Sequence, residues 1–292
     1  MAKRRRNIGA SVRARLLTLA RAKGRAFDIV LTRYVLERLL YRLSLSRHRE
    51  RFALKGALLI TTWFSDPHRP TRDVDLLGFG DSSPEAILSV FREVSGIEAD
   101  DGVTFDVESL AVELIREQIE YGGLRLRLTS GLAGARIPTV IDVGFGDSVE
   151  PGLEEIELPV LLEMPAPRLR AYPRETVIAE KFEAMVHFGR ANSRMKDFYD
   201  VWLLSKAYEF DQARLAKAIA ATFERRRTEI PSEVPDALTP EFARDASKRR
   251  QWDAFVRELA ASPGSLERVV SDLAAFLMPM AEKARGSTRN GD

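Results

Sequence analysis

The sequence predicts an α+β fold in which a half with mixed helices and strands precedes a half made of helices. Residues 122–130 and 138–147 alternate apolar and polar side chains with the period of two that indicates a half-buried strand. After residue 173 the apolar residues recur only at helical spacing. A proline-rich stretch, 159–175, separates the two patterns, and we place a domain boundary near Pro173.

The predicted organisation has four parts. Residues 10–44 show the apolar spacing of two helices broken near Gly24. Residues 51–64 begin as a buried turn and continue as a helix or a strand, which periodicity does not decide. The expected parts are basic N-terminal helices packed on the next domain (1–50), an α+β domain with a small mixed sheet flanked by helices (51–173), a helical domain (174–282) and a disordered tail (283–292).

Composition narrows the possible chemistry. The 292 residues include no cysteine and three histidines, which excludes disulfides, thiol nucleophiles and cysteine zinc sites and disfavours a histidine-rich metal site. A bound metal would therefore be held mainly by oxygen, as Mg²⁺ or Mn²⁺ is. No apolar run approaches the roughly 20 residues of a membrane span, and no signal-peptide core follows the basic start, so a cytoplasmic protein is expected.

The net charge of +2 conceals an asymmetry. Residues 1–51 contain 15 Lys and Arg against 3 Asp and Glu, whereas the rest of the chain contains 30 against 40. A basic segment beside an acidic body is typical of a protein with an anionic partner such as nucleic acid. It is equally the pattern of a solvated helix face whose arginines pair with the acidic body.

Two aspartates, Asp73 and Asp75, lie one residue apart in a predicted strand. Side chains alternate across a strand, so both carboxylates point to one side while Val74 points to the other. Carboxylates this close repel each other unless a metal ion, a basic side chain or water at an exposed edge compensates them. An Asp-x-Asp pair therefore indicates a metal site only when further ligands join it.

Asp142 is the natural third ligand. It lies on the polar face of its own predicted strand, and it joins the pair if the two strands are neighbours. Three partly buried carboxylates without cations would cost several kcal/mol. Two divalent ions about 3.5–4 Å apart would neutralise them, in the arrangement that serves phosphoryl and nucleotidyl transfer. Asp147 is a second candidate, but it falls past the end of the strand, so Asp142 is preferred.

Two further patterns suggest contacts with phosphate. Gly56, preceded by Lys55, permits close approach of the backbone, and amides near it could hold a phosphate; tight packing at a helix start would require the same glycine. Lys181 falls inside the apolar helical arc that runs from Val177 to Phe188. A lysine placed there needs an anion.

The following predicted helix supplies carboxylates for Lys181. Asp197 lies within its inner face and Asp200 at the edge of that face. The two helices are therefore either locked by a structural Lys–Asp bridge, or Lys181 binds a nucleotide phosphate and Asp200 orients it or the acceptor.

In order, these motifs resemble one family over roughly residues 50–205: the AbiEii/AbiGii-type nucleotidyltransferase toxins, which include mycobacterial toxins that modify tRNA. The resemblance implies a polymerase-beta-like nucleotidyltransferase domain followed by a helical domain. It places Gly56, with Lys55 and Ala57 beside it, in the first motif. Asp73 and Asp75 match the metal-binding pair, and Arg72 precedes them. Asp142 matches the third carboxylate. Lys181 matches the third motif and Asp200 the fourth, with Arg194 and Asp197 close by.

The resemblance also implies partners. Such proteins act as toxins of toxin–antitoxin or phage-defence modules, so it implies a cognate antitoxin, Mg²⁺ (or Mn²⁺), a nucleoside triphosphate and an RNA acceptor, with the tRNA 3′ end as the expected target. One position departs from the pattern, because polymerase-beta-like enzymes usually have serine after the first-motif glycine and this chain has Ala57. The alternatives are transfer to a small molecule or protein, and a silent module that binds nucleic acid or a partner.

Overall fold

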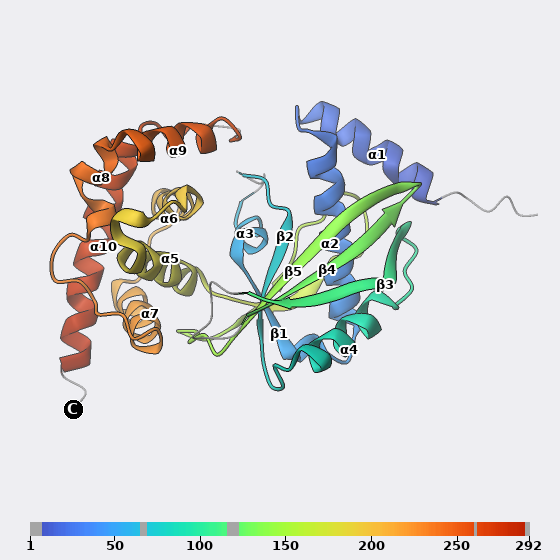
Figure 1. The fold of residues 1–292 in the computed structure, drawn as a ribbon, viewed down its shortest axis with the longest axis horizontal. Coiled ribbons are helices and arrows are strands. Elements are labelled where there is room, and N and C mark those ends of the chain that lie inside the picture. Colours follow the sequence, from blue (N-terminus) through green and yellow to red (C-terminus); the bar gives the residue numbers. More distant parts are fainter. Residues whose placement is uncertain (1–7, 65–68, 116–122, 260–261, 290–292) are drawn as a thin grey trace, which may run out of the picture. The chain divides into compact units, whose positions relative to one another are not determined.

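The computed structural model describes residues 8–64, 69–115, 123–259 and 262–289 (Figure 1). The chain divides into two compact units: the first comprises residues 1–146 and 155–171, and the second comprises residues 147–154 and 172–292. Four of the basic residues noted at the N-terminus fall within 1–7, outside the described residues. In the described part of the chain, every helix is too short or too polar to cross a membrane.

The first unit is built on a mixed sheet of seven strands in the order β3-β4-β5-β2-β1-β7-β6. β2 runs parallel to β5 and antiparallel to β1, and β5 runs antiparallel to β4. The strands are β1 (Phe52–Lys55), β2 (Asp73–Gly78), β3 (Val103–Leu114), β4 (Gly123–Leu132), β5 (Ala135–Phe145), β6 (Glu154–Glu157) and β7 (Arg168–Ala171).

Helices pack on this sheet, and two of them form the predicted N-terminal pair. Gly24 separates that pair and has a φ of +60°, which glycine adopts without steric cost. Apolar side chains of the pair, among them Leu16 and Tyr34, share one buried cluster with Leu132 and Ile137 of the sheet. The helices of the unit are α1 (Ile8–Ala22), α2 (Phe27–Leu45), the short η1 (Arg49–Arg51), α3 (Gly56–Ile60) and α4 (Pro84–Ser95).

The two strands predicted from alternation are confirmed, as is their antiparallel pairing. Leu124, Leu126 and Leu128 of β4 are buried, and Ile141 and Val143 of β5 are fully enclosed. Because the N-terminal helices share the buried cluster with this apolar face, the opposite face carries the polar side chains. That opposite face holds the candidate site.

Two parts of the sheet could be assigned only from the tertiary structure. The stretch 51–64 resolves into β1 followed at once by α3, with the change of direction at Gly56. The strand β3 was not predicted, since its side chains alternate between partly buried and exposed and few of them are strongly apolar. Its pairing with β4 gives it a place in the sheet.

The second unit is helical, as predicted for the C-terminal half. Its helices surround a core that includes Phe182, Phe198 and Phe223, each fully buried. Figure 1 shows them as the olive to red coils. They are α5 (Arg174–Phe188), the short η3 (Gly189–Ala191), α6 (Met195–Ala207), α7 (Gln212–Arg225), the short η4 (Asp236–Leu238), α8 (Pro240–Arg244), α9 (Ala246–Val256) and α10 (Leu266–Arg289).

Two expectations about this unit were wrong. The tail predicted to be disordered from residue 283 is helical through Arg289, because small side chains such as Ala284 bury one face of α10 and Lys283 donates to Gln212 at 2.5 Å. Residues 290–292 of that tail lie outside the described residues. Phe188, assigned to the inner face of its helix, is 43% exposed because α5 ends there.

Candidate active site

Three aspartates converge on the polar face of the first unit's sheet. β2 places Asp73 and Asp75 on one side, and the parallel register with β5 sets Asp142 directly beside Asp75. One carboxylate oxygen from each of the three residues lies within 4.8 Å of the others, and all three side chains are half-buried. This cluster, the acidic triad, provides the hard oxygen ligands that Mg²⁺ and Mn²⁺ prefer.

Arg125 faces the triad from β4. Its Nε donates to Asp142 Oδ1 at 2.8 Å and its Nη2 donates to Asp142 Oδ2 at 2.6 Å. These hydrogen bonds raise the pKa of Arg125, burial opposes the rise, and the charges of Asp142 and Asp73 add to it. The guanidinium compensates one of the three carboxylates. A divalent ion at the triad would therefore share Asp142 with Arg125 or displace it.

Gly56 lies against the triad at the junction of β1 and α3. Its φ is +69°, and a β-carbon added there would lie 2.0 Å from Asp75 Oδ2. The preceding residue, Lys55, is the cross-strand partner of Asp75. Position 56 thus requires glycine for two reasons, the left-handed backbone and the adjacent carboxylate. This is the tight packing at a helix start that the sequence also allowed for Gly56. The contact of nearby amides with a phosphate stays a prediction.

Thr71 and Arg72 precede the first aspartate. Thr71 Oγ1 donates to Asp73 Oδ1 at 2.8 Å and so orients that carboxylate. Arg72 Nη2 donates instead to Asp28 of α2 at 2.8 Å, in an exposed ion pair. Arg72 was predicted to bind the nucleotide, and in the structure its guanidinium is engaged with this helix.

A second charged cluster lies within the second unit. Lys181 of α5 donates to Asp197 Oδ1 at 2.6 Å and lies 2.9 Å from Asp200 Oδ2, both on α6. Arg194 Nε donates to Asp197 Oδ2 at 2.5 Å. Both carboxylates are fully buried and Lys181 is 12% exposed. The Lys–Asp bridge between two helices, one of the two readings of this pattern, is present.

Burial and ion pairing act in opposite directions on Asp197. Burial by itself raises the pKa of its carboxyl, because the charged form loses hydration. Lys181 and Arg194 outweigh burial and hold the pKa of Asp197 below its usual range. Asp197 is therefore an anion that fixes two cations, while Asp200 has Lys181 as its ion-pair partner.

Comparisons with known proteins agree with this arrangement. A model of the family described as nucleotidyl transferase AbiEii toxin, type IV TA system, matches residues 38–275. The chain belongs to the AbiEii family. It is accordingly a nucleotidyltransferase toxin of a type IV toxin–antitoxin system, which implies a cognate antitoxin and a nucleoside triphosphate substrate.

Two solved structures share the fold of this chain. The crystal structure of JHP933 from Helicobacter pylori is 13% identical, with a TM-score of 0.52, over 91% of this chain and 97% of that chain. A crystal structure named "putative nucleotidyltransferase from H. pylori" is 14% identical, with a TM-score of 0.53, over 89% of this chain and 98% of that chain. A search of curated proteins found no match.

Asp147, the alternative third carboxylate, has a different setting in this AbiEii chain. It belongs to the second unit, where it accepts a hydrogen bond from the Tyr172 hydroxyl at 2.9 Å. The ligand atoms within 4.8 Å of one another are those of Asp73, Asp75 and Asp142. The structure thus places Asp142 with the pair.

Sequence reasoning missed Arg125 and Thr71. The alternation in β4 did show Arg125 on a polar face, but the register that sets it opposite Asp142 is a property of the folded sheet. It also missed that Glu183, within the family's lysine motif, accepts hydrogen bonds from Arg226 at 2.7 Å and Thr228 at 2.6 Å. Glu183 therefore ties α5 to the segment after α7.

Proposed function

We propose that this AbiEii protein is a magnesium-dependent nucleotidyltransferase that transfers a nucleotide from a nucleoside triphosphate to RNA, with the tRNA 3′ end as acceptor. The acidic triad with Gly56 against Asp75 is the observation that supports it best. A transferase of this kind must hold a polyphosphate beside a cluster of oxygen ligands, and the backbone at Gly56 lies against such a cluster here. Such activity would suit a toxin or a phage-defence role.

The proposed reaction forms one bond and breaks one bond. A ribose hydroxyl oxygen of the acceptor bonds to the α-phosphorus, and the bond from that phosphorus to the bridging oxygen breaks to release pyrophosphate. The proton of the hydroxyl passes to Asp142, while Arg125 fixes the orientation of that carboxylate through its two hydrogen bonds. Asp73 and Asp75, with Asp142 as the third carboxylate, would hold Mg²⁺, which supplies charge neutralisation for the triphosphate when it is bound.

The remaining predicted residues take positioning roles in this proposal. Lys55 and the backbone around Gly56 and Ala57 approach the triphosphate, and Ala57 leaves that contact to amide groups because it has no hydroxyl. Lys181 contributes a positive charge to a phosphate and Asp200 orients it, as their 2.9 Å ion pair permits. Asp197 and Arg194 hold Lys181 in place.

A transfer assay tests the proposal. Purified protein is incubated with Mg²⁺, one α-labelled nucleoside triphosphate at a time, and total bacterial tRNA. Label on tRNA that is lost with EDTA and in Asp75→Asn is expected. The matched control is Asp100→Asn, which makes the same change at an exposed aspartate of the same unit and should retain transfer. Label on a small molecule or on protein, with none on RNA, would overturn the proposed acceptor.

A further inference from the structure

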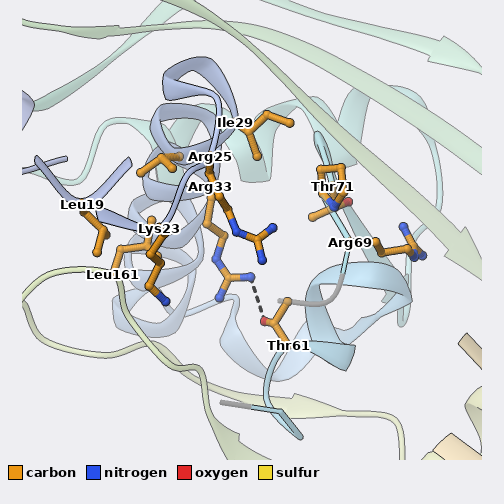
Figure 2. A pocket seen from close by; sticks show the side chains of 11 residues that line it. Leu19, Lys23, Arg25, Ile29, Arg33, Thr61, Arg69, Thr71 and Leu161 are labelled. Atoms are coloured by element: carbon orange, nitrogen blue, oxygen red, sulfur yellow. Dashed lines mark hydrogen bonds between the residues drawn. The ribbon is translucent and has the colours of Figure 1, made fainter. Parts of the chain in front are cut away.

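The first unit contains a pocket close to the acidic triad. It lies where the turn between α1 and α2 meets the end of α3 and the segment that leads into β2 (Figure 2). Thr71 belongs to both sites, because it lines this pocket and donates to Asp73 Oδ1 at 2.8 Å. A ligand in the pocket would therefore lie next to the residue that begins the metal-binding pair.

Four cations and several apolar side chains line this site, which we call the basic pocket. The cations are Lys23, Arg25, Arg33 and Arg69, and none of the eleven described lining residues is acidic. Figure 2 shows Arg25 and Arg33 extending toward the middle of the pocket. Apolar walls with convergent cations suit a ligand that has a flat, weakly polar part and a negative charge. The apolar walls come from Leu19, Ile29, Val30, Pro70 and Leu161.

Arg33 at the floor of the basic pocket has an incomplete set of partners. It is 8% exposed and donates to two neutral oxygens, Thr61 Oγ1 at 2.7 Å and the Pro159 carbonyl at 3.1 Å. Its buried Nε has no acceptor among the described residues. About two and a half turns further along α2, Arg42 has the complete set of partners that Arg33 lacks: both of its terminal nitrogens donate to the carboxylate of Asp101, at 2.6 and 3.1 Å.

The charged form of the Arg33 guanidinium is therefore disfavoured by its surroundings. Burial lowers the pKa of its guanidinium, and the nearby charge of Glu37 only partly opposes that effect. A phosphate entering the pocket would provide the anionic acceptor that Asp101 provides for Arg42. Guanidinium groups bind phosphate with matched geometry and strong, charge-assisted hydrogen bonds.

We infer that the basic pocket holds one nucleotide of the acceptor RNA strand, with its base against the apolar walls and its phosphate on Arg33 and the surrounding cations Lys23, Arg25 and Arg69. This assignment rests on the proposed function. Thr61, at the far end of α3, lines the pocket, whereas Gly56 begins that helix beside Asp75. Five residues of helix span about 7.5 Å. The pocket therefore offers a second nucleotide site, separated from the place proposed for the triphosphate.

The α1–α2 side of the pocket comes from residues 19–33, which lie before the segment matched by the AbiEii family model. Single-stranded RNA is bound by cations along its backbone and by aromatic rings or guanidinium planes on which unstacked bases lie. This pocket offers the cations and the guanidinium planes of its arginines, and its remaining walls are mainly aliphatic. The excess of basic residues over residues 1–51 is then partly explained by the rim of this pocket.

Direct binding tests this inference without catalysis. The affinity of a fluorescently labelled single-stranded RNA oligonucleotide is measured by anisotropy over a range of salt concentrations, without Mg²⁺ or triphosphate. Lys23→Ala/Arg25→Ala should weaken binding at least tenfold and reduce the slope of log K against log salt by about 0.7 for each lost phosphate contact. Ile29→Trp, which fills the pocket and keeps its charge, should weaken binding and leave the slope unchanged.

The matched control is Arg15→Ala/Arg21→Ala, which removes two exposed positive charges from α1 outside the pocket. Equal weakening in this control would overturn the inference, because overall charge would then explain the binding. Loss of Mg²⁺–triphosphate affinity in the pocket variant, with RNA affinity intact, would also overturn it and assign the pocket to the donor. RNA binding through the pocket in a protein that transfers nothing to RNA would refute the proposed function and leave the RNA site established.

Discussion

The carboxylate of Asp75 occupies the space that a side chain at Gly56 would need. The β-carbon of an alanine at position 56 would lie 2.0 Å from Asp75 Oδ2, and the φ of +69° is one that alanine rarely adopts. Gly56 directly follows β1 and Asp75 lies on β2, which pairs with β1. The glycine predicted for the first motif and an aspartate of the predicted metal-binding pair therefore constrain each other directly. The backbone conformation at Gly56 thereby leaves room for the carboxylate of Asp75 in its observed position.

Gly56→Ala should therefore abolish transfer and destabilise the first unit. The backbone strain alone costs on the order of 1–3 kcal/mol, and displacement of Asp75 adds to it. Thermal unfolding and the tRNA labelling assay measure the two effects. Gly80→Ala is the matched control, since Gly80 has a φ of +84° but no atom within 4 Å of an added β-carbon. That control should lose stability and retain transfer; equal loss of transfer in both variants would show that the close approach to Asp75 is irrelevant.

Arg125→Gln should strengthen the binding of Mn²⁺ to the acidic triad. The guanidinium competes with a cation for Asp142, and its removal leaves an uncompensated carboxylate that favours the metal. We expect an increase in affinity of about tenfold, equivalent to about 1.4 kcal/mol, by calorimetric titration. Arg127→Gln serves as control because Arg127 lies two residues along the same strand and pairs with exposed Glu113. Weaker Mn²⁺ binding in Arg125→Gln would show instead that Arg125 helps to assemble the site.

Asp200→Asn and Asp197→Asn should separate the catalytic and structural readings of the Lys181 cluster. Asp197 pairs with both Lys181 and the half-exposed Arg194, so its loss removes a buried carboxylate from two cations at once and should destabilise the protein by up to about 3–5 kcal/mol. Asp200 pairs with Lys181, which keeps Asp197 as a partner, so a smaller loss of stability with a large loss of transfer is expected. Denaturant unfolding measures the loss of stability, and the transfer assay measures the loss of activity. Wild-type transfer in Asp200→Asn would show that the Lys181 cluster only holds α5 and α6 together and takes no part in transfer.

Glu37 should make the stability of the first unit depend on pH. Burial raises the pKa of this carboxyl to about 7, against the effects of Arg33, the Leu161 amide and Arg38. A raised folded-state pKa means that stability is complete below the unfolded pKa of 4.5 and falls as pH rises toward 7, by about 3 kcal/mol. Unfolding measured between pH 4 and 8 should show this decline.

In Glu37→Gln the decline attributed to Glu37 should be absent, because an amide does not titrate. Glu98→Gln, at an exposed site of the same unit, should keep it. A pH profile in Glu37→Gln that matches the wild type would contradict the assignment of this titration to Glu37.

Much of the candidate site could be predicted from local patterns in the sequence. Alternation placed Asp73 and Asp75 on one face and Asp142 on the polar face of its strand, and helical spacing placed Lys181 where an anion was needed. These conclusions hold because each depends on a period of two or 3.6 residues within one element. The order of the motifs then indicated the family, which the match over residues 38–275 confirms.

The sequence by itself determined the α+β first half, the helical second half, the two paired strands and the candidate ligands. Only the tertiary structure decided which strands are neighbours, and hence that Asp142 lies beside Asp75 and that Arg125 reaches Asp142. It also brought Lys23, Arg33, Thr61 and Arg69 to one pocket. The physical reason is the difference in sequence range between the two kinds of information. Periodicity reflects how one segment meets an apolar environment, whereas register and pocket walls depend on the packing of segments far apart in the chain.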